Sequence, residues 1–475
     1  EMDEARKHYE QALEINPNFT EAHYYLGLLL CEQGNMNEGK QHFEQVLKIN
    51  PKDVGAHTNL GNILDEEGNV EQAMNHFERA LNSDPYSVNV HYNIAILLHK
   101  EGNWDRARNH YEQALEINPE HGGTHNNLGL LFREQKKPQE ASTHYERALQ
   151  INPKNAKAHN NLANLLRELG NPEQAREHYE EAVNINPEYG QAHFNIGKLY
   201  CELNQPEQAR THYERALQIN PENAEAHYNL GVLLGEKGEL DTARKHLEKA
   251  AQISPEAPGI HLTLGDLLRK EEEPKKARKH LKRAVDINPE KAENHLYFAA
   301  LLREQGEPEK AKKHFERAIK INPRDLGAHQ HLGLLFSEEG EPEKAREHYE
   351  KAIEINPEDA KTRANLALIL LSNNNIKQAI EHAVAAIKLG TLPDGGKILA
   401  KKFSHHLETL RKIIKQSNTA SKEAGGGALA FLLVAAPDDE KEKLEKQIKE
   451  AEFPESQVEL CREVMERIGN VKDNV

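Results

Sequence analysis

The sequence predicts an all-α protein built from stacked helical hairpins, and three observations lead to this fold class. A proline recurs every 34 residues from Pro17 to Pro357 without any insertion. Each interval contains two stretches whose apolar residues follow the spacing of one helical face. Both stretches contain a position that is always glycine or alanine. Because one two-helix unit cannot bury its apolar face alone, the repeat requires neighbours and predicts a solenoid.

Residues 156–187 show the elements of one hairpin. The first predicted helix carries leucines at i, i+3, i+4 and i+7: Leu162, Leu165, Leu166 and Leu169. The second carries smaller and aromatic residues on one face: Ala175, Tyr179, Ala182 and Val183. Gly170 can take the left-handed conformation that ends the first helix, and Pro172 suits the first turn of the second. Pro187 then closes the hairpin.

Two kinds of repeated position predict how the helices pack: the positions that are always glycine or alanine (the small columns), and a position that is aromatic or large (the aromatic column). Small residues on facing sides, such as Gly197 and Ala209, allow the helices of one hairpin to approach closely. A third column, from Tyr9 to Tyr349, is aromatic or large, and we expect it to fill the gap towards the next hairpin.

The repeat resembles the tetratricopeptide repeat (TPR). The pattern L-G-x-x-[LFY], then A-x-x-x-[YF], a further alanine and a final proline at this period is typical of that family. The resemblance covers residues 1 to about 390 and implies a right-handed superhelix of about eleven and a half hairpins. It also implies a concave face that holds an extended peptide or a partner helix. The family's early tryptophan is replaced by histidine, as in His159, and we expect this position to be only partly buried.

The chain divides into four predicted segments. Residues 1–390 form the solenoid, in which 1–19 are the second helix of an incomplete repeat. Because the matching first helix is absent, we favour a fragment over an orphan capping helix. Residues 391–415 are predicted to be a capping helix, 416–427 a flexible linker rich in Ser, Thr and Gly, and 428–475 a helical tail.

Composition narrows the class of partner. The formal net charge of -16 opposes nucleic acid and anionic membranes and favours a basic protein or peptide. The longest apolar run, Ala428–Ala436, is too short to cross a bilayer. Cys31, Cys201 and Cys461 are far apart, which predicts the cytoplasm or another reducing compartment. Since no nucleophile–base motif, phosphate loop or CxxC occurs, we expect neither catalysis nor a cofactor.

A polar stripe on the first helices is the candidate binding site. One of its positions repeats as asparagine: Asn59, Asn93, Asn127, Asn161, Asn195 and Asn229. Within 156–168 the stripe also contains Lys157, Asn160 and Asn164, and Lys198 lies near the next asparagine. A carboxamide can bond both the N–H and the C=O of an extended backbone. The row resembles the asparagine ladder of O-linked N-acetylglucosamine transferases, which implies peptide binding here without their catalytic domain. The alternative is that these asparagines are solvated and repeated by duplication.

Two other sites are disfavoured. A two-carboxylate clamp needs several cations, and only Lys157 and Lys198 occur in the asparagine zone. Most of the 27 histidines fall in two columns, represented by His159 and His178. Equivalent histidines on successive hairpins are too far apart to share a metal. We therefore expect no metal site, and histidine seams that loosen the array as the pH falls through roughly 6.5.

Three functions remain open. The chain could be a non-enzymatic scaffold that holds an extended partner in its groove. It could instead be the substrate-selecting arm of a larger enzyme such as a glycosyltransferase, or a structural spacer in a multiprotein assembly.

Overall fold

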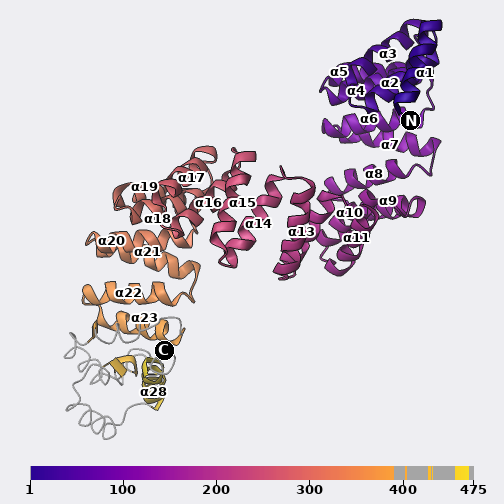
Figure 1. Cartoon of the computed structure of the whole chain (residues 1–475). Coiled ribbons are helices and arrows are strands. Elements are labelled where there is room, and N and C mark those ends of the chain that lie inside the picture. The colour runs from indigo at the N-terminus through magenta and orange to yellow at the C-terminus, as the bar shows by residue number, and fades with distance from the viewer. Residues whose placement is uncertain (1, 390–401, 404–425, 429, 432–454, 470–475) are drawn as a thin grey trace, which may run out of the picture. The chain divides into compact units, whose positions relative to one another are not determined.

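The computed structural model describes residues 2–389, 402–403, 426–428, 430–431 and 455–469 (Figure 1). Secondary structure in these ranges is helical, with turns between the helices and no strand. The predicted capping helix at 391–415 lies outside the described residues except for 402–403. The predicted linker at 416–427 lies outside them except for its last two glycines.

Short first helices alternate with slightly longer second helices, which confirms the hairpin prediction (Figure 1). The first helices are α2 (Thr20–Glu32), α4 (Val54–Glu66), α6 (Val88–Lys100), α8 (Gly122–Glu134), α10 (Ala156–Glu168), α12 (Gly190–Glu202), α14 (Ala224–Glu236), α16 (Pro258–Lys270), α18 (Ala292–Glu304), α20 (Leu326–Glu338) and α22 (Ala360–Ser372). The second helices are α3 (Met36–Ile49), α5 (Val70–Ser83), α7 (Trp104–Ile117), α9 (Pro138–Ile151), α11 (Pro172–Ile185), α13 (Pro206–Ile219), α15 (Leu240–Ile253), α17 (Pro274–Ile287), α19 (Pro308–Ile321), α21 (Pro342–Ile355) and α23 (Ile376–Lys388).

Helix α1 (Met2–Ile15) precedes the first hairpin and packs against α2, and α28 (Glu455–Gly469) follows the last. The chain forms two units, Glu1–Leu230 and Gly231–Val475, and the division falls inside α14. Within each unit, the second helix of one hairpin packs on the first helix of the next, as α9 does on α10 and α17 on α18. None of the described helices combines the length and apolar character needed to span a membrane.

Where the small column of a first helix is glycine, it receives a large side chain from the second helix of the same hairpin. A Cβ added to Gly61 would lie 2.5 Å from Cε1 of Phe77, and one added to Gly197 would lie 2.6 Å from Cδ1 of Tyr213. The aromatic column therefore packs first inside its own hairpin, and the prediction that it fills the gap to the next one was incomplete. Phe315 does both, since its ring also stacks on His331 of the following hairpin, with centroids 5.0 Å apart.

The turn inside each hairpin places one residue in the left-handed region. Gly170 has a φ of 77°, as predicted, and the same position in other repeats is occupied by Lys136, Asn204, Glu272 and Asn374 with φ of 56–58°. A side chain with a Cβ is strained there, by roughly 1–2 kcal/mol.

Replacing Lys136 by glycine is therefore expected to stabilise the hairpin of α8 and α9 by about 1 kcal/mol, because glycine takes this conformation without strain. Urea unfolding of the full chain measures the gain. The control is Lys136→Ala, which removes the same charge but keeps the Cβ. Equal stability of the two variants would contradict the strain argument.

The two histidine columns meet inside the hairpins. Nδ1 of His159 lies 2.9 Å from Nδ1 of His178, and Nε2 of His159 lies 3.0 Å from the carbonyl oxygen of Pro153. With Nε2–H donating to that carbonyl, Nδ1 of His159 is left to accept a hydrogen bond from Nδ1–H of His178. The same Nδ1–Nδ1 contact, 2.8–3.1 Å long, recurs in other hairpins.

The first histidine of these pairs is more buried than we predicted. His57 and His329 are each 2% exposed, and His159 is 9% exposed. The expectation of partial burial is therefore wrong at these positions, although it holds for His125 and His193. The ring lies inside the hairpin because the proline carbonyl and the second histidine together satisfy both of its nitrogens.

The last hairpin is covered by residues from the C-terminal part of unit 2. Helix α28 packs against α23, and Lys388 Nζ lies 3.5 Å from Oε2 of Glu463. A Cβ added to Gly427 would lie 2.5 Å from Cγ2 of Val384, so this glycine allows close backbone contact with α23. Ala383, which replaces the aromatic of earlier repeats, is fully buried.

Candidate peptide-binding face

The asparagine row lies on the first helices of unit 1. Asn59 is in α4, Asn93 in α6, Asn127 in α8, Asn161 in α10 and Asn195 in α12, while Asn229 is in α14. Asn195 is 8% exposed, and the others are half-buried. Each carboxamide therefore lies at the boundary between the helix packing and the surface.

Most of these asparagines bond the preceding first helix. Nδ2 of Asn161 donates to Oδ1 of Asn126 at 3.0 Å, and Nδ2 of Asn195 donates to Oδ1 of Asn160 at 2.9 Å. Nδ2 of Asn127 donates to Oη of Tyr92 at 3.1 Å, and the Asn59 amide makes a longer 3.3 Å bond to Tyr24. In each case the acceptor lies 35 residues earlier. One N–H of each of these four carboxamides thus joins successive hairpins, which the sequence did not reveal.

Two members of the row, Asn93 and Asn229, have other partners. For Asn93 the residue 35 positions earlier is Thr58, and Nδ2 instead donates to Oδ1 of Asn62 at 2.9 Å. For Asn229 the residue is Phe194, which offers no acceptor, and Nδ2 donates to the carbonyl of Glu225 in its own helix at 2.9 Å. The hydrogen bond from an asparagine to the residue 35 positions earlier is therefore not made at every hairpin.

The other predicted site residues, two asparagines and two lysines, lie outside the repeated asparagine position. Asn160 is 3% exposed and serves as the acceptor for Asn195, so it lies inside the face. Asn164 accepts a 2.6 Å bond from Oη of Tyr179 in α11 and is thus held towards its own hairpin. Lys157 is exposed on α10, and Lys198 lies over the ring of Phe194, with Nζ 5.7 Å from the centroid.

A row of ion pairs runs beside the asparagines. Arg133 in α8 pairs with Glu168 in α10 at 3.1 Å, and Arg167 in α10 pairs with Glu202 in α12 at 2.5 Å. Within unit 2, Arg269 pairs in the same way with Glu304 at 2.6 Å. The partner is again 35 residues away. Periodicity along one helix cannot reveal such pairs, because it contains no information on the offset between neighbouring repeats.

Helix α20 of unit 2 carries a different group at the asparagine position, which Asn365 of α22 occupies again in the next hairpin. His331 replaces the carboxamide there, and burial together with the nearby Arg303, Lys361 and Arg269 lowers its pKa to about 4. A hollow of about 180 Å³ lies beside it, lined by Arg303, Gln330, His331, Leu334, Lys361, Thr362 and Asn365. The stripe is therefore carboxamide-rich in unit 1 and cationic at this point of unit 2.

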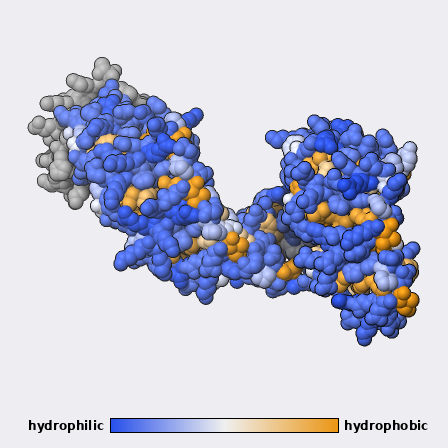
Figure 2. All heavy atoms as spheres, turned by 90° about the horizontal axis from the view of Figure 1, so that it is seen from above, coloured by the Kyte–Doolittle hydropathy of each residue, from blue (hydrophilic) through white to orange (hydrophobic). Residues whose placement is uncertain are grey.

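The surface favours recognition by polar groups. Figure 2 shows a largely hydrophilic face with small, separate apolar patches. Large apolar side chains that are clearly exposed include Tyr25, Tyr86 and Trp104. Among the described residues, no group of three or more His, Cys, Asp or Glu side chains is arranged to hold a metal ion.

Comparison with protein families identifies the repeat. Residues 86–154 and 156–189 match models described as tetratricopeptide repeat, as do residues 30–92, and residues 1–34 match the TPR repeat. The chain is a tetratricopeptide-repeat protein. Residues 188–401 of this TPR protein also match the model described as the C-terminal domain of cilia and flagella-associated protein 70.

Several solved structures resemble this TPR protein. The pilF structure from Pseudomonas aeruginosa is 23% identical, with 44% of this chain and 95% of that chain covered and a TM-score of 0.42. The APC/C hetero-tetramer Cut9-Hcn1 is 14% identical, with 83% and 92% covered and a TM-score of 0.47. YrrB, described as a TPR protein with an unusual peptide-binding site, is 28% identical, with 41% and 97% covered and a TM-score of 0.35. A comparison with curated proteins found no match.

Proposed function

We propose that this TPR protein is a non-catalytic scaffold that holds an extended polypeptide along the first helices α4 to α14. The observation that supports the proposal is the orientation of Asn161 within the row. One N–H of Asn161 is committed to Asn126, which fixes the carboxamide plane. Among the described residues, none donates to its Oδ1. The second N–H and that oxygen can therefore meet the C=O and N–H of a bound backbone. Oδ1 of Asn127 and Oδ1 of Asn195 each accept one hydrogen bond already, from Asn126 and Gln191, and keep a second lone pair for a partner.

The spacing of the row also fits an extended chain. Neighbouring packed helices are about 8–10 Å apart, and an extended polypeptide advances about 3.3 Å per residue. One carboxamide would thus meet about every third residue of the partner, whatever its side chains. The net charge of -16 favours a partner that is basic overall. We place this scaffold in a reducing compartment, as the three free cysteines suggest.

A second candidate is a subunit of a large assembly. The match of residues 188–401 to the C-terminal domain of cilia and flagella-associated protein 70 favours it. In that case partners would contact the chain over both units, and crosslinking followed by mass spectrometry of the native complex would place contacts beyond the asparagine row.

Replacing Asn127, Asn161 and Asn195 together by alanine is expected to abolish most peptide capture while the array stays folded. Each substitution removes a carboxamide that would bond the partner backbone, and each lost intramolecular bond costs about 0.5–1.5 kcal/mol. Binding to an array of random, unstructured peptides measures capture, and circular dichroism confirms the helices.

The matched control replaces three exposed asparagines of the second helices, Asn75, Asn109 and Asn184, by alanine. This variant should bind the same peptides as the unmodified protein. If the first triple variant retains the peptides as well as the control does, the backbone-clamp proposal is wrong.

A further inference from the structure

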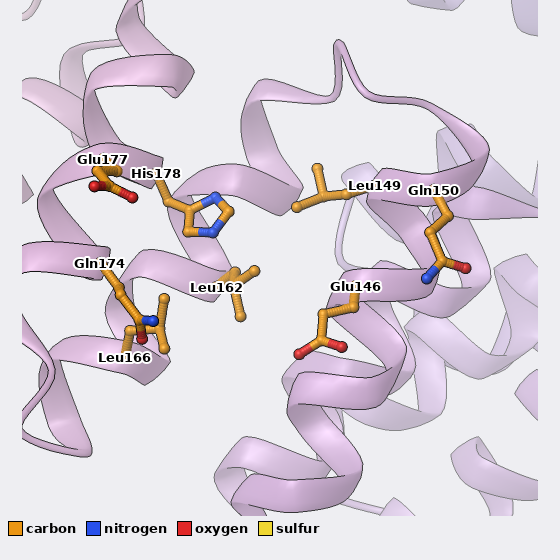
Figure 3. Close-up of a pocket in the computed structure, with 8 residues that line it drawn as sticks. All are labelled: Glu146, Leu149, Gln150, Leu162, Leu166, Gln174, Glu177 and His178. Carbon is orange, nitrogen blue, oxygen red and sulfur yellow. The ribbon is translucent and has the colours of Figure 1, made fainter.

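Hollows lie between successive second helices within each unit. Figure 3 shows one in unit 1, of about 520 Å³. Glu146 and Gln150 of α9 lie on one side of it, and Glu177 and His178 of α11 lie on the other. Leu162 and Leu166 of α10 also line it. Its lining comes from two second helices and from the leucines of α10, and it contains no residue of the asparagine row.

The equivalent hollow in unit 2 lies three repeats later, between α15 and α17, and has a volume of about 570 Å³. Glu248 and Gln252 of α15 take the places of Glu146 and Gln150. On the α17 side the lining residues are Lys279, Lys282, Arg283 and Asp286. The shape of the repeat is thus kept while the chemistry of one wall changes.

The charge of that wall is reversed residue by residue. The carboxylates Glu173, Glu177, Glu180 and Glu181 of α11 correspond to the cations Lys275, Lys279, Lys282 and Arg283 of α17. All eight side chains are exposed, so neither set is needed to pack the helices. Exposed residues that do not support packing are free to vary, and four reversals on one helix concentrate positive charge in a chain of net charge -16.

Several of these cations have no partner of their own. Arg283 pairs with Glu256, and Lys276 pairs with Glu273 at 2.6 Å. Within the described part of the chain, no carboxylate lies within ion-pair distance of Lys279 or Lys282, and both line the hollow. They lie three residues apart in α17, so their ammonium groups project from one face of the helix.

We propose that the hollow between α15 and α17 docks an acidic segment of a partner protein, with two carboxylates of that segment paired to Lys279 and Lys282. Glu248 and Asp286 in the same lining favour a peptide over a nucleic acid. A peptide can present separate carboxylates to the two lysines and keep neutral residues beside the acids. A nucleic acid carries a phosphate at every nucleotide and would bring negative charge against both carboxylates. This hollow therefore binds an acidic segment, whereas the net charge of the whole chain favours a basic partner.

The test uses the full chain and a fluorescent peptide of alternating glutamate and leucine, with the glutamine–leucine peptide as a neutral probe. Lys279→Glu combined with Lys282→Glu is expected to weaken binding of the acidic peptide at least about tenfold at low salt, because two attractive contacts become repulsive. The effect should shrink as salt is raised.

The control variant is Lys48→Glu combined with Lys154→Glu, which makes the same change in net charge at exposed lysines of unit 1. It should bind the acidic peptide like the unmodified protein. The asparagine triple variant should also bind it normally, so failure of this proposal is distinct from failure of the proposed function. Equal loss in both lysine variants would overturn the docking site. Tighter binding of a short oligothymidylate, or of phosphatidylserine vesicles, than of the acidic peptide would also overturn it.

Discussion

Unfolding experiments are expected to show that the array loses stability progressively as the pH falls from about 6.5 towards 4. Burial and the facing histidine lower the pKa of the second histidine of several pairs to about 4: His76, His110, His144, His212, His280 and His348. The unfolded chain titrates near 6.5. Above 6.5 both states are neutral at these sites and the stabilisation is complete. Below it the unfolded state binds protons that the folded state does not, and stability is lost.

The expected loss of folding stability is large because the contributions of the six histidines add up. Each such histidine contributes at most about 1.4 kcal/mol per pH unit, and partial exposure reduces this amount. Summed over the array, we expect a loss on the order of 5–10 kcal/mol between pH 7 and pH 4.5. Carboxylates oppose part of the effect: Glu112 acts on His144, and Glu347 acts on His348. A pair with both histidines charged would bring two N–H groups face to face, so the second proton breaks the contact.

Urea unfolding followed by circular dichroism at a series of pH values measures this slope. His144→Phe combined with His212→Phe removes two titrating rings while keeping two flat side chains, and it should reduce the number of protons taken up on unfolding. An unfolding midpoint that does not move between pH 7 and pH 5 would refute the interpretation of the seams.

Gly197→Leu is expected to destabilise unit 1 by about 1–3 kcal/mol or more, because the helix crossing has no room for a side chain. The added Cβ would lie 2.6 Å from Cδ1 and Cε1 of Tyr213, a ring that is 1% exposed. Since a repeat array contacts only its neighbours, the damage should start in the hairpin of α12 and α13. Hydrogen exchange would then be faster in these helices than in distant ones.

The control is Gly259→Leu in α16, where a Cβ meets nothing within 4 Å. Comparing the two Gly→Leu variants separates the cost of overpacking from the effect of losing the backbone freedom of glycine. If both leucine variants unfold at the same urea concentration, close contact in the small column does not limit the packing of the hairpin.

The helices and their ends could be predicted from the sequence, because the relevant physics is local. The leucine spacing from Leu162 to Leu169 gives α10, and Gly170 has the left-handed φ that its position predicted. The identity of the repeat followed from the same residues. Lys136 shows the limit of this reasoning, since a lysine in the left-handed region is visible only by alignment with the glycines of other repeats.

The contacts between helices could not be predicted in the same way. His159 meets His178 because of the offset between two facing helices, and periodicity along either helix does not contain that offset. The bond from Asn161 to Asn126 depends on a residue in the previous repeat. The basic composition of α17 is evident in the sequence, but its concentration on one wall of a hollow follows only from how α15 and α17 pack.

The 35-residue offset of the arginine–glutamate pairs between first helices has a consequence for how such a gene can change. Arg133 meets Glu168, and Arg167 meets Glu202, by the same rule. If recombination removed one 34-residue period, the arginine before the junction would meet the next glutamate in line. Between α8 and α12 one period can therefore be deleted without leaving an arginine unpaired, whereas loss of the period that contains Lys100 would bring Asp65 opposite Glu134.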